Sequence, residues 1–458
     1  MPVTTSMPPR VCDAATLPAD VPEVPVAIVG AGACGLTAAI FLRERGVDCL
    51  LVERDPQPRG STALSSGFVP APGTRAQREA GVLDDDVERF VADIQAKADG
   101  RAAPHLARAY AAAIGPALDA LESRHGLRFE LLDGFVYPGH SRRRMHALPE
   151  RTGLALVQAL ERAALSAGVL VLGQARARDL YVDGAGTVCG LGCERPDGST
   201  ELLRCHALLL ACNGYGGNAA LVREFLPEMR DAPFVGHVGN DGTAVLWGRA
   251  LGAALADLSG CQGHGSWATP HGGLVTWAVM SEGGVQVNAL GDRFHDERGG
   301  YSEAAVAVLR QPGGISWNVL DERLLALARG FPDFRALEAI GAVRMIEGVQ
   351  GAAALIGCDA ARLRRSVEGT RLGAPVALVR VTGALFHTQG GLDVDERMRV
   401  RRSDGRRFGG LWAAGGAARG VSGDSVSGYL SGNGLLSAIA GGFIAAGAVG
   451  EFILAGVE

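Results

Sequence analysis

Hydrophobic and polar positions follow the periods of an α/β fold. The first apolar run, Val26 to Val29, is short and partly β-branched, as expected of a strand buried on both faces. A helical pattern follows, and a second apolar run, Cys49 to Val52, completes a strand–helix–strand unit. From Asp84 to Leu127 apolar residues recur three and four positions apart, which predicts helices that end at Gly126.

Beyond this region the pattern changes several times. Another helical segment leads into strands joined by turns at Asp183-Gly184 and Asp197-Gly198, and Ala207 to Cys212 reads as a buried strand. From about Pro233 to Gly383 short strands and helices mix, and the tail returns to strand, turn and helix. The glycine- and serine-rich segment after Glu53 predicts loop or irregular backbone.

These patterns predict one nucleotide-binding domain interrupted by an insertion. We expect an α/β fold in which a Rossmann-like domain, a parallel sheet with helices on its faces, comprises residues 24–232 and 384–458. An inserted α+β capping or substrate domain would occupy residues 233–383. The proline-rich residues 1–23 predict a flexible N-terminal arm without the apolar core of a signal peptide.

The turn between the first strand and helix carries a nucleotide-binding motif. Gly30, Gly32 and Gly35 have the spacing G-x-G-x-x-G, which allows a tight turn, close approach of a pyrophosphate and close helix packing. Glu53 ends the second strand, where a carboxylate can accept hydrogen bonds from a ribose. The motif predicts a dinucleotide and leaves open whether it is FAD or NAD.

Two polar segments are candidates for ligand contacts. Hydroxyls and amides of Ser61, Thr62, Ser65 and Gly67 could face a flavin or phosphates, or could form a plain surface loop. The arginine loop, residues 140–146, contains His140, Arg142, Arg143, Arg144 and His146. It could bind a substrate carboxylate or a cofactor phosphate, or it could be a solvated loop.

Composition narrows the partners and the compartment. Among 458 residues, 47% are hydrophobic and 20% charged, and the net charge of −5 without a long basic run argues against nucleic acid or an anionic membrane as partner. Nine cysteines show no C-x-x-C spacing, which favours reduced thiols in a cytoplasmic protein without a metal site. The C-terminal LLSAIAGGFIAAGAVG is interrupted by glycines, so we expect no stable membrane insertion.

Eight segments in order resemble the fumarate reductase and 3-ketosteroid dehydrogenase group of flavoproteins, within the fumarate reductase and succinate dehydrogenase superfamily. They are VAIVGAGACGLTAA, the acid Glu53, RGSTALSSGF, LLLACNGYGGN, GNDGTAVLWGRALGA, VQVNALGDRFHDE, FHTQGGLDVDERMRV and GLWAAGGAARGVSG. The resemblance covers about Val24 to Glu458. It implies non-covalent FAD in a two-domain fold, with the active site between the FAD domain and the capping domain.

The motif and the resemblance together give the expected FAD-binding residues. They are Gly30, Gly32, Ala33, Cys34, Gly35, Glu53, Arg54, Ser61, Thr62, Ser65, Ser66, Gly67, Asn213, Gly214, Asp241, Gly415, Gly416, Gly432, Gly434, Leu435 and Leu436.

The resemblance also implies the reaction. Where fumarate reductases place two arginines, this chain has Tyr301 and Tyr429, similar to the tyrosines of ketosteroid dehydrogenases. Tyr301 would remove the proton next to a ketone, while Tyr429 and the backbone N–H of Asn433 would hydrogen-bond the ketone oxygen, and hydride would pass to the flavin. Because a phenol ordinarily has a pKa of about 10, a tyrosine base needs help; Tyr137 and Tyr110 are candidate helpers.

His387 departs from the ketosteroid pattern. It matches the carboxylate-binding histidine of fumarate reductases in His-Thr-x-Gly-Gly. We therefore expect an FAD-dependent desaturase of a cyclic ketone, either an oxocyclohexanecarboxylate held by His387 and the arginine loop or an uncharged ketone such as a 3-ketosteroid. The alternatives are a reductase of an activated C=C bond and a non-catalytic flavin-binding protein. Without heme or iron–sulfur motifs, electrons would leave to a separate acceptor, namely oxygen, a quinone or a carrier protein.

Overall fold

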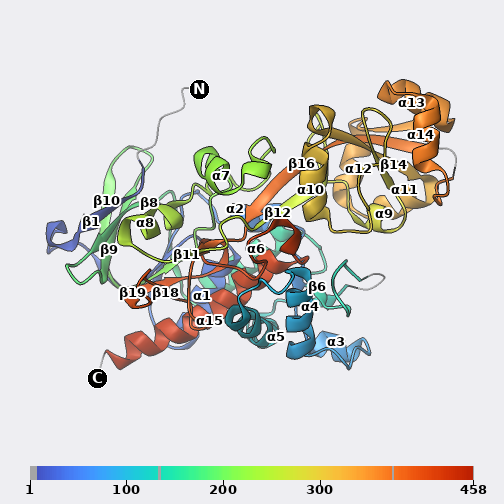
Figure 1. Cartoon of the computed structure of the whole chain (residues 1–458). Coiled ribbons are helices and arrows are strands. Elements are labelled where there is room, and N and C mark those ends of the chain that lie inside the picture. Colours follow the sequence, from blue (N-terminus) through green and yellow to red (C-terminus); the bar gives the residue numbers. More distant parts are fainter. Residues whose placement is uncertain (1–7, 133–135, 374–375, 457–458) are drawn as a thin grey trace. The chain divides into compact units, whose positions relative to one another are not determined.

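The chain forms two compact units, which the computed structural model describes over residues 8–132, 136–373 and 376–456 (Figure 1). Unit 1 comprises Met1–Leu221, Gly236–Gly260 and His387–Glu458, and unit 2 comprises Val222–Val235 and Cys261–Phe386. The predicted α/β fold class with an FAD-binding domain is confirmed.

The boundary of the insertion differs from the expected 233–383. Unit 2 contains most of that range, but residues 236–260 belong to unit 1. The reason is pairing and packing: β11 (Leu255–Ala256) is antiparallel to β17 (Gly391–Leu392), and α8 (Thr243–Leu251) packs on β17.

Unit 1 is built on a nine-stranded sheet. Strands β7, β3, β2, β10 and β19 are parallel neighbours, and β9 and β8 extend the sheet in antiparallel fashion from β10. The strands are β1 (Arg10–Asp13), β2 (Glu23–Val29), β3 (Cys49–Val52), β7 (Leu170–Leu172), β8 (Arg176–Val182), β9 (Val188–Glu194), β10 (Thr200–Leu210), β18 (Arg399–Arg401) and β19 (Arg407–Ala413). A smaller sheet contains β4 (Val69–Pro70), β5 (Glu130–Leu131) and β6 (Met145–Ala147).

The N-terminal segment is part of this sheet. Strand β1 pairs in parallel with β8, and the Arg10 guanidinium donates to both carboxylate oxygens of Asp179 at 2.9 Å. Trp247 Nε1 donates to the Arg10 carbonyl at 2.9 Å. The prediction of a flexible arm over residues 1–23 is therefore wrong for the paired segment, while residues 1–7 lie outside the described residues.

Helices cover the sheet of unit 1 and include those expected. They are α1 (Ala33–Glu44), α2 (Gly60–Leu64), α3 (Arg75–Glu79), α4 (Val87–Lys97), α5 (Pro104–His125), α6 (Gly153–Ser166), α7 (Ala219–Phe225, which continues into unit 2), α8 and α15 (Asn433–Ala455). Helix α5 ends at Gly126, whose φ of 73° suits glycine. Helix α2 lies within the segment predicted to be loop; its N-terminal half is Gly-Ser-Thr.

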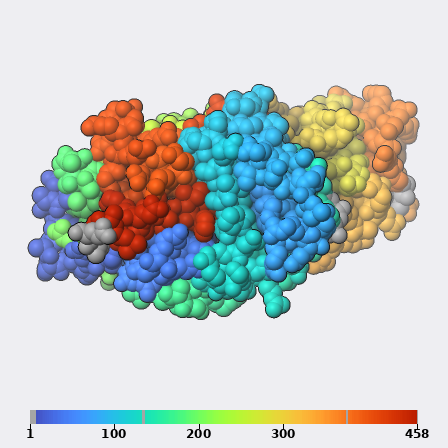
Figure 2. All heavy atoms as spheres, turned by 90° about the horizontal axis from the view of Figure 1, so that it is seen from below, coloured from blue at the N-terminus to red at the C-terminus, as the bar shows by residue number. Residues whose placement is uncertain are grey.

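Helix α15 packs against α1 and α5. The face shown in Figure 2 has the C-terminal segment (red) beside the N-terminal segment (blue). By length and composition α15 could cross a membrane, but 50% of its apolar window is buried within the protein. This burial supports a core helix.

Unit 2 is organised around a five-stranded sheet in which β12, β16, β14 and β13 follow one another and β15 pairs with β16. Its strands are β12 (Cys261–Ala268), β13 (Val285–Asn288), β14 (Ile315–Asp321), β15 (Val343–Ile346) and β16 (Val376–Thr388, whose last two residues belong to unit 1). Its helices are α9 (Ala278–Ser281), α10 (Tyr301–Leu309), α11 (Glu322–Ala328), α12 (Pro332–Ala339), α13 (Gly348–Ile356) and α14 (Ala360–Val367).

All nine cysteines carry free thiols, and most lie in the interior. Burial raises the pKa to about 12 for six of them: Cys34, Cys49, Cys193, Cys205, Cys212 and Cys261. In the described part of the chain, no group of three or more His, Cys, Asp or Glu side chains could hold a metal ion.

Candidate active site

Of the three glycines in the turn between β2 and α1, only Gly32 has free space beside its backbone. Gly30 has a φ of 103°, and a Cβ there would lie 2.5 Å from the Ala211 carbonyl oxygen. A Cβ on Gly35 would lie 1.9 Å from the carbonyl oxygen of Gly30, so both positions need glycine for packing. A Cβ on Gly32 would meet only the Thr62 hydroxyl, at 3.4 Å. The open backbone at Gly32 is where a pyrophosphate fits.

Glu53 shapes the same turn from the end of β3. Its carboxylate is buried and accepts from the backbone N–H of Ala31 at 2.8 Å and of Asp55 at 3.0 Å. Desolvation raises its pKa, and these two N–H groups oppose the shift. A carboxylate oxygen has two lone pairs, so this group can still accept from a ribose. The open turn and the buried acid therefore fit a dinucleotide.

Segments distant in sequence close around this turn. Asn213 has a φ of 65°, and its Oδ1 accepts from the Gly214 N–H at 2.8 Å. A Cβ on Gly416 would lie 2.1 Å from that oxygen, and one on Gly415 would lie 3.2 Å from Cys34 Cβ. The structure thus brings together expected FAD-binding residues from three places in the sequence.

The α2 segment has hydrogen bonds of its own. Thr62 Oγ1 accepts from the Ala33 N–H at 3.0 Å, at the start of α1. The Ser65 hydroxyl donates to the Thr62 carbonyl at 2.7 Å and accepts from the Gly67 N–H at 3.1 Å, which fixes the turn. Ser61 Oγ accepts from Asn240 Nδ2 at 2.9 Å, and Ser66 is exposed.

Arg54 and Asp241, also expected near FAD, form an ion pair. Arg54 Nη1 lies 3.3 Å from Asp241 Oδ2, which also accepts from Arg176 at 3.0 Å. The two charges therefore largely neutralise each other.

Uncharged groups converge where α15 begins. Gly432, with a φ of 87°, caps this helix, while Leu435 and Leu436 pack into the core. The Tyr429 hydroxyl lies 3.4 Å from the Gly434 N–H, and the Tyr429 and His387 rings meet edge to face with centroids 5.6 Å apart. A Cβ on Gly434 would lie 2.6 Å from His387 Nε2. The structure thus brings Tyr429, His387 and Gly434 together.

Asn433 lies in the same turn, but its backbone N–H is engaged differently from the prediction. This N–H donates to the Leu430 carbonyl at 3.0 Å, so the N–H that approaches the Tyr429 hydroxyl belongs to Gly434. The reason is the tight turn between Leu430 and Asn433, which precedes the first full turn of α15. The fully buried Asn433 side chain instead donates to Ser422 at 3.0 Å, and its Oδ1 has no partner among the described residues.

His387 is electrically neutral near pH 7. Burial lowers its pKa to about 4, opposed by the Thr388 carbonyl. Its Nδ1 lies 3.1 Å from that carbonyl oxygen and 3.0 Å from Gln389 Nε2. A neutral imidazole can donate one hydrogen bond but offers no full charge to a carboxylate.

Tyr301 belongs to unit 2 and is the first residue of α10. Its ring stacks on His264 with centroids 4.9 Å apart and an interplanar angle of 22°. His264 stacks in turn on Phe386 at 5.5 Å and meets Trp277 edge to face at 5.9 Å. Burial lowers the pKa of His264 to about 3, so its imidazole is neutral near pH 7.

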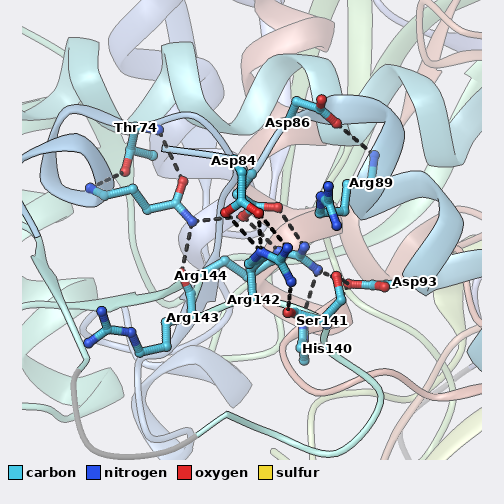
Figure 3. A network of polar contacts seen from close by, with 12 residues as sticks. Thr74, Asp84, Asp86, Arg89, Asp93, His140, Ser141, Arg142, Arg143 and Arg144 are labelled. Carbon is cyan, nitrogen blue, oxygen red and sulfur yellow. Dashed lines mark hydrogen bonds and ion pairs between the residues drawn. The ribbon is translucent and has the colours of Figure 1, made fainter. Parts of the chain in front are cut away.

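Arg142 and Arg144 of the arginine loop are paired with carboxylates (Figure 3). Arg144 is fully buried, and Asp85, equally buried, accepts from it at 2.6 and 3.0 Å. Arg144 also pairs with Asp93, and Arg142 pairs with Asp84 at 2.9 Å. The prediction that Arg144 holds a substrate carboxylate is therefore wrong, because Asp85 and Asp93 neutralise it in the interior. For the partly exposed Arg142, which pairs with Asp84, it stays a prediction.

The two histidines of that loop have hydrogen bonds within the fold. His140 Nε2 donates to the Ser431 carbonyl at 3.0 Å, and burial lowers the pKa of His140 to about 4. His146 lies 2.8 Å from the Thr74 hydroxyl. The pocket beside the loop has a volume of about 10 Å³, room for one water molecule.

The two candidate helpers of Tyr301 belong to unit 1 and contact other residues there. The Tyr110 hydroxyl lies in the core, 3.5 Å from Met398 Sδ, and the Tyr137 ring lies 6.3 Å from that of Phe68. Sequence reasoning missed His264, which no motif marks, and Gln389, whose position two residues after His387 is the available signal.

Comparison with known proteins agrees with this geometry. At 26% identity over 447 residues, the chain is similar to a probable fumarate reductase, Ifc3, of Shewanella frigidimarina, covering 92% of this chain and 74% of that protein. A flavocytochrome c3 fumarate reductase in its open conformation superposes with a TM-score of 0.82 at 25% identity, covering 96% of this chain and 80% of the other.

A second solved structure is the 3-ketosteroid-Δ4-(5α)-dehydrogenase of Rhodococcus jostii RHA1 in complex with 4-androstene-3,17-dione. Its TM-score is 0.78 at 22% identity, with 97% of this chain and 100% of that chain covered, which shows the shared fold. A family model described as FAD binding domain matches residues 25–435. The chain belongs to this FAD binding domain family, in the fumarate reductase superfamily, and is an FAD-dependent oxidoreductase that acts on CH–CH groups.

Proposed function

We propose that this enzyme desaturates an uncharged cyclic ketone, a 3-ketosteroid or a smaller ring ketone, at the bond α,β to the carbonyl. The observation that carries the proposal is the group of neutral donors at the start of α15, formed by Tyr429, His387 and the Gly434 N–H. Neutral donors polarise a carbonyl oxygen, whereas a dicarboxylate requires cations.

Polarisation acidifies the hydrogen next to the carbonyl, and Tyr301 would remove it. Tyr301 lies in the first turn of α10, where backbone N–H groups favour a negative charge by about 0.3–1 kcal/mol. His264 holds the phenol ring face to face, which orients its hydroxyl. FAD, when bound, supplies the oxidant that takes the hydride from the β-carbon.

The paired arginines favour an uncharged substrate over an oxocyclohexanecarboxylate. Arg144 is fully buried against Asp85, and Arg142 is tied to Asp84. His387 is neutral. These three groups thus offer little charge to a substrate carboxylate.

A second candidate function is reduction of an activated C=C bond. The similarity to the probable fumarate reductase favours it. Tyr301 and Tyr429, in place of the two arginines that the resemblance implies, oppose a dicarboxylate substrate. The electrons of either reaction would pass through a separate partner such as oxygen, a quinone or a carrier protein.

Anaerobic titration of the FAD-loaded enzyme distinguishes these functions. We expect a 3-ketosteroid or cyclohexanone to bleach the oxidised flavin band, and 4-oxocyclohexanecarboxylate to do so at least ten times more slowly. Tyr301→Phe should retain FAD and lose most of the bleaching rate, while Tyr181→Phe, on β8, serves as control. Fast oxidation of the chemically reduced enzyme by fumarate, without bleaching by any ketone, would establish the reductase.

A further inference from the structure

A chain of side-chain hydrogen bonds runs behind His387, within unit 1. Asn433 Nδ2 donates to Ser422 Oγ at 3.0 Å, and Ser422 donates to Gln389 Oε1 at 2.8 Å. Gln389 Nε2 then lies 3.0 Å from His387 Nδ1. Asn433, Ser422 and Gln389 are buried, with exposed fractions of 0%, 1% and 3%. These contacts couple the protonation of His387 to a turn more than 30 residues away.

The donors and acceptors of this hydrogen-bond network can be arranged in two directions. In one, Gln389 donates to His387 Nδ1, so the imidazole proton resides on Nε2. In the other, both amides are reversed, Nδ1 carries the proton and donates to the Thr388 carbonyl or Gln389, and Nε2 becomes an acceptor.

The Asn433 end of this hydrogen-bond network differs between the two directions. In the first direction the atom left without a partner among the described residues is Asn433 Oδ1. In the reversed direction it would be the Asn433 NH₂ group, with two donors. Buried N–H groups without a partner are rarer than under-satisfied carbonyl oxygens, so the Asn433 end favours the first direction. The Thr388 carbonyl, 3.1 Å from Nδ1, favours the second direction.

We propose that Gln389, held by Ser422 and Asn433, is a positioning residue that fixes His387 as the Nε2–H tautomer and thereby keeps a second neutral hydrogen-bond donor for the carbonyl oxygen of the substrate. The role of this donor in turnover rests on the proposed function. His387 Nε2 faces the Cα of Gly434, where a Cβ would lie 2.6 Å away, on the side of the Tyr429 ring. An Nε2–H there adds a second donor beside the phenol.

The titratable group that faces His387 is Tyr429, from the turn before α15. The polar groups that contact His387 Nδ1 from the following residues are the Thr388 carbonyl and the Gln389 amide. Removing the Gln389 donor leaves the Thr388 carbonyl as partner of Nδ1, which favours the Nδ1–H tautomer. Replacing it with a carboxylate favours Nδ1–H and raises the pKa of His387.

The first test uses ¹⁵N-histidine-labelled, FAD-loaded enzyme without substrate, with the His387 signal assigned by its loss in His387→Gln. We expect the parent at pH 7 to show Nε2–H with an unprotonated Nδ1. Gln389→Leu should show Nδ1–H, and Gln389→Glu should show Nδ1 protonated. Gln350→Glu, on exposed α13, adds the same charge far from the site and should match the parent. Nδ1–H in the parent, or a parent-like spectrum in both Gln389 variants, would overturn the assignment.

The second test is kinetic and addresses the role of the Nε2–H donor in turnover. Gln389→Leu should lower kcat/KM for a bleaching ketone by 10-fold or more while FAD stays bound. Gln389→Glu should acquire a pH dependence in which kcat/KM rises as pH falls and imidazolium restores the Nε2–H donor. Unchanged kcat/KM and a parent-like pH profile in both variants would overturn the role of Gln389 in turnover. If no ketone reacts with the parent, the proposed function fails while the ¹⁵N spectra still decide the tautomer.

Discussion

Replacing Arg144 with Met should destabilise the protein far more than replacing its neighbour Arg142. The guanidinium of Arg144 is fully buried, pairs with Asp85 and Asp93, and lies 4.6 Å from the centre of the Phe90 ring. Methionine fills much of the same volume but leaves Asp85 as a buried carboxylate with Gln77 as its described donor, at 2.7 Å. Removing one partner of a buried ion pair costs about 3–5 kcal/mol.

Arg142→Met is the matched control. Its partner Asp84 has a side chain that is 59% exposed, and such surface pairs contribute less than about 1 kcal/mol. The two variants remove the same charge two positions apart in one loop (Figure 3). The difference between them therefore isolates the effect of burial.

Urea unfolding of both FAD-loaded variants, followed by far-ultraviolet circular dichroism, measures the effect. With an m value of about 3 kcal/mol per molar urea, the Arg144→Met midpoint should fall by about 1 M or more. A double variant, Asp85→Leu with Arg144→Met, should recover part of the loss because no unpaired charge remains at that position. Equal midpoints for Arg144→Met and Arg142→Met would refute the reasoning.

Three further predictions concern pH, the cofactor and the helix start. Burial lowers the pKa of His140 and His146 to about 4, so the unfolded chain binds more protons than the folded protein between pH 6.5 and 4. The free energy of unfolding should therefore decrease as the pH is lowered through this range, by up to about 1.4 kcal/mol per pH unit for each histidine. A His146→Asn variant should show a smaller decrease in urea midpoint over the same range. Glu53→Ala should weaken FAD retention about 10-fold or more in ultrafiltration, and parent-like retention would contradict the ribose contact. Gly434→Ala should lower ketone bleaching at least 10-fold with FAD still bound, because its Cβ would lie 2.6 Å from His387 Nε2; a parent-like rate would show that the site can widen.

Local signals were enough to predict the architecture of the nucleotide-binding unit. The apolar run Val26–Val29 is a central strand, flanked by β3 and β10, and Gly126 ends α5 with a positive φ. These features depend on short-range patterns of burial and backbone freedom, which a sequence records directly. The roles of Tyr429 and His387, by contrast, were expected only from the resemblance to a known family.

What could not be predicted depends on partners far along the chain. The acids that neutralise Arg142 and Arg144 lie about 50 to 60 residues earlier, and Asp179, which anchors Arg10, lies 169 residues later. Composition shows that such charges exist but not which of them meet. The same limit applies to the hydrogen bond between Asn433 and Ser422, which depends on the geometry of one turn.

Chemical labelling of this protein would meet little background from its buried cysteines once the half-buried Cys12, Cys189 and Cys358 are replaced. Alkylating reagents attack the thiolate, and at pH 7 a thiol with a pKa of about 12, such as Cys34 or Cys261, is ionised in about one molecule in 10⁵. Both thiols lie in the interior of their own unit, so an introduced surface cysteine would react long before them. In a variant without these three thiols, fluorophores attached to one new cysteine in each unit would test whether substrate binding changes the distance between the units.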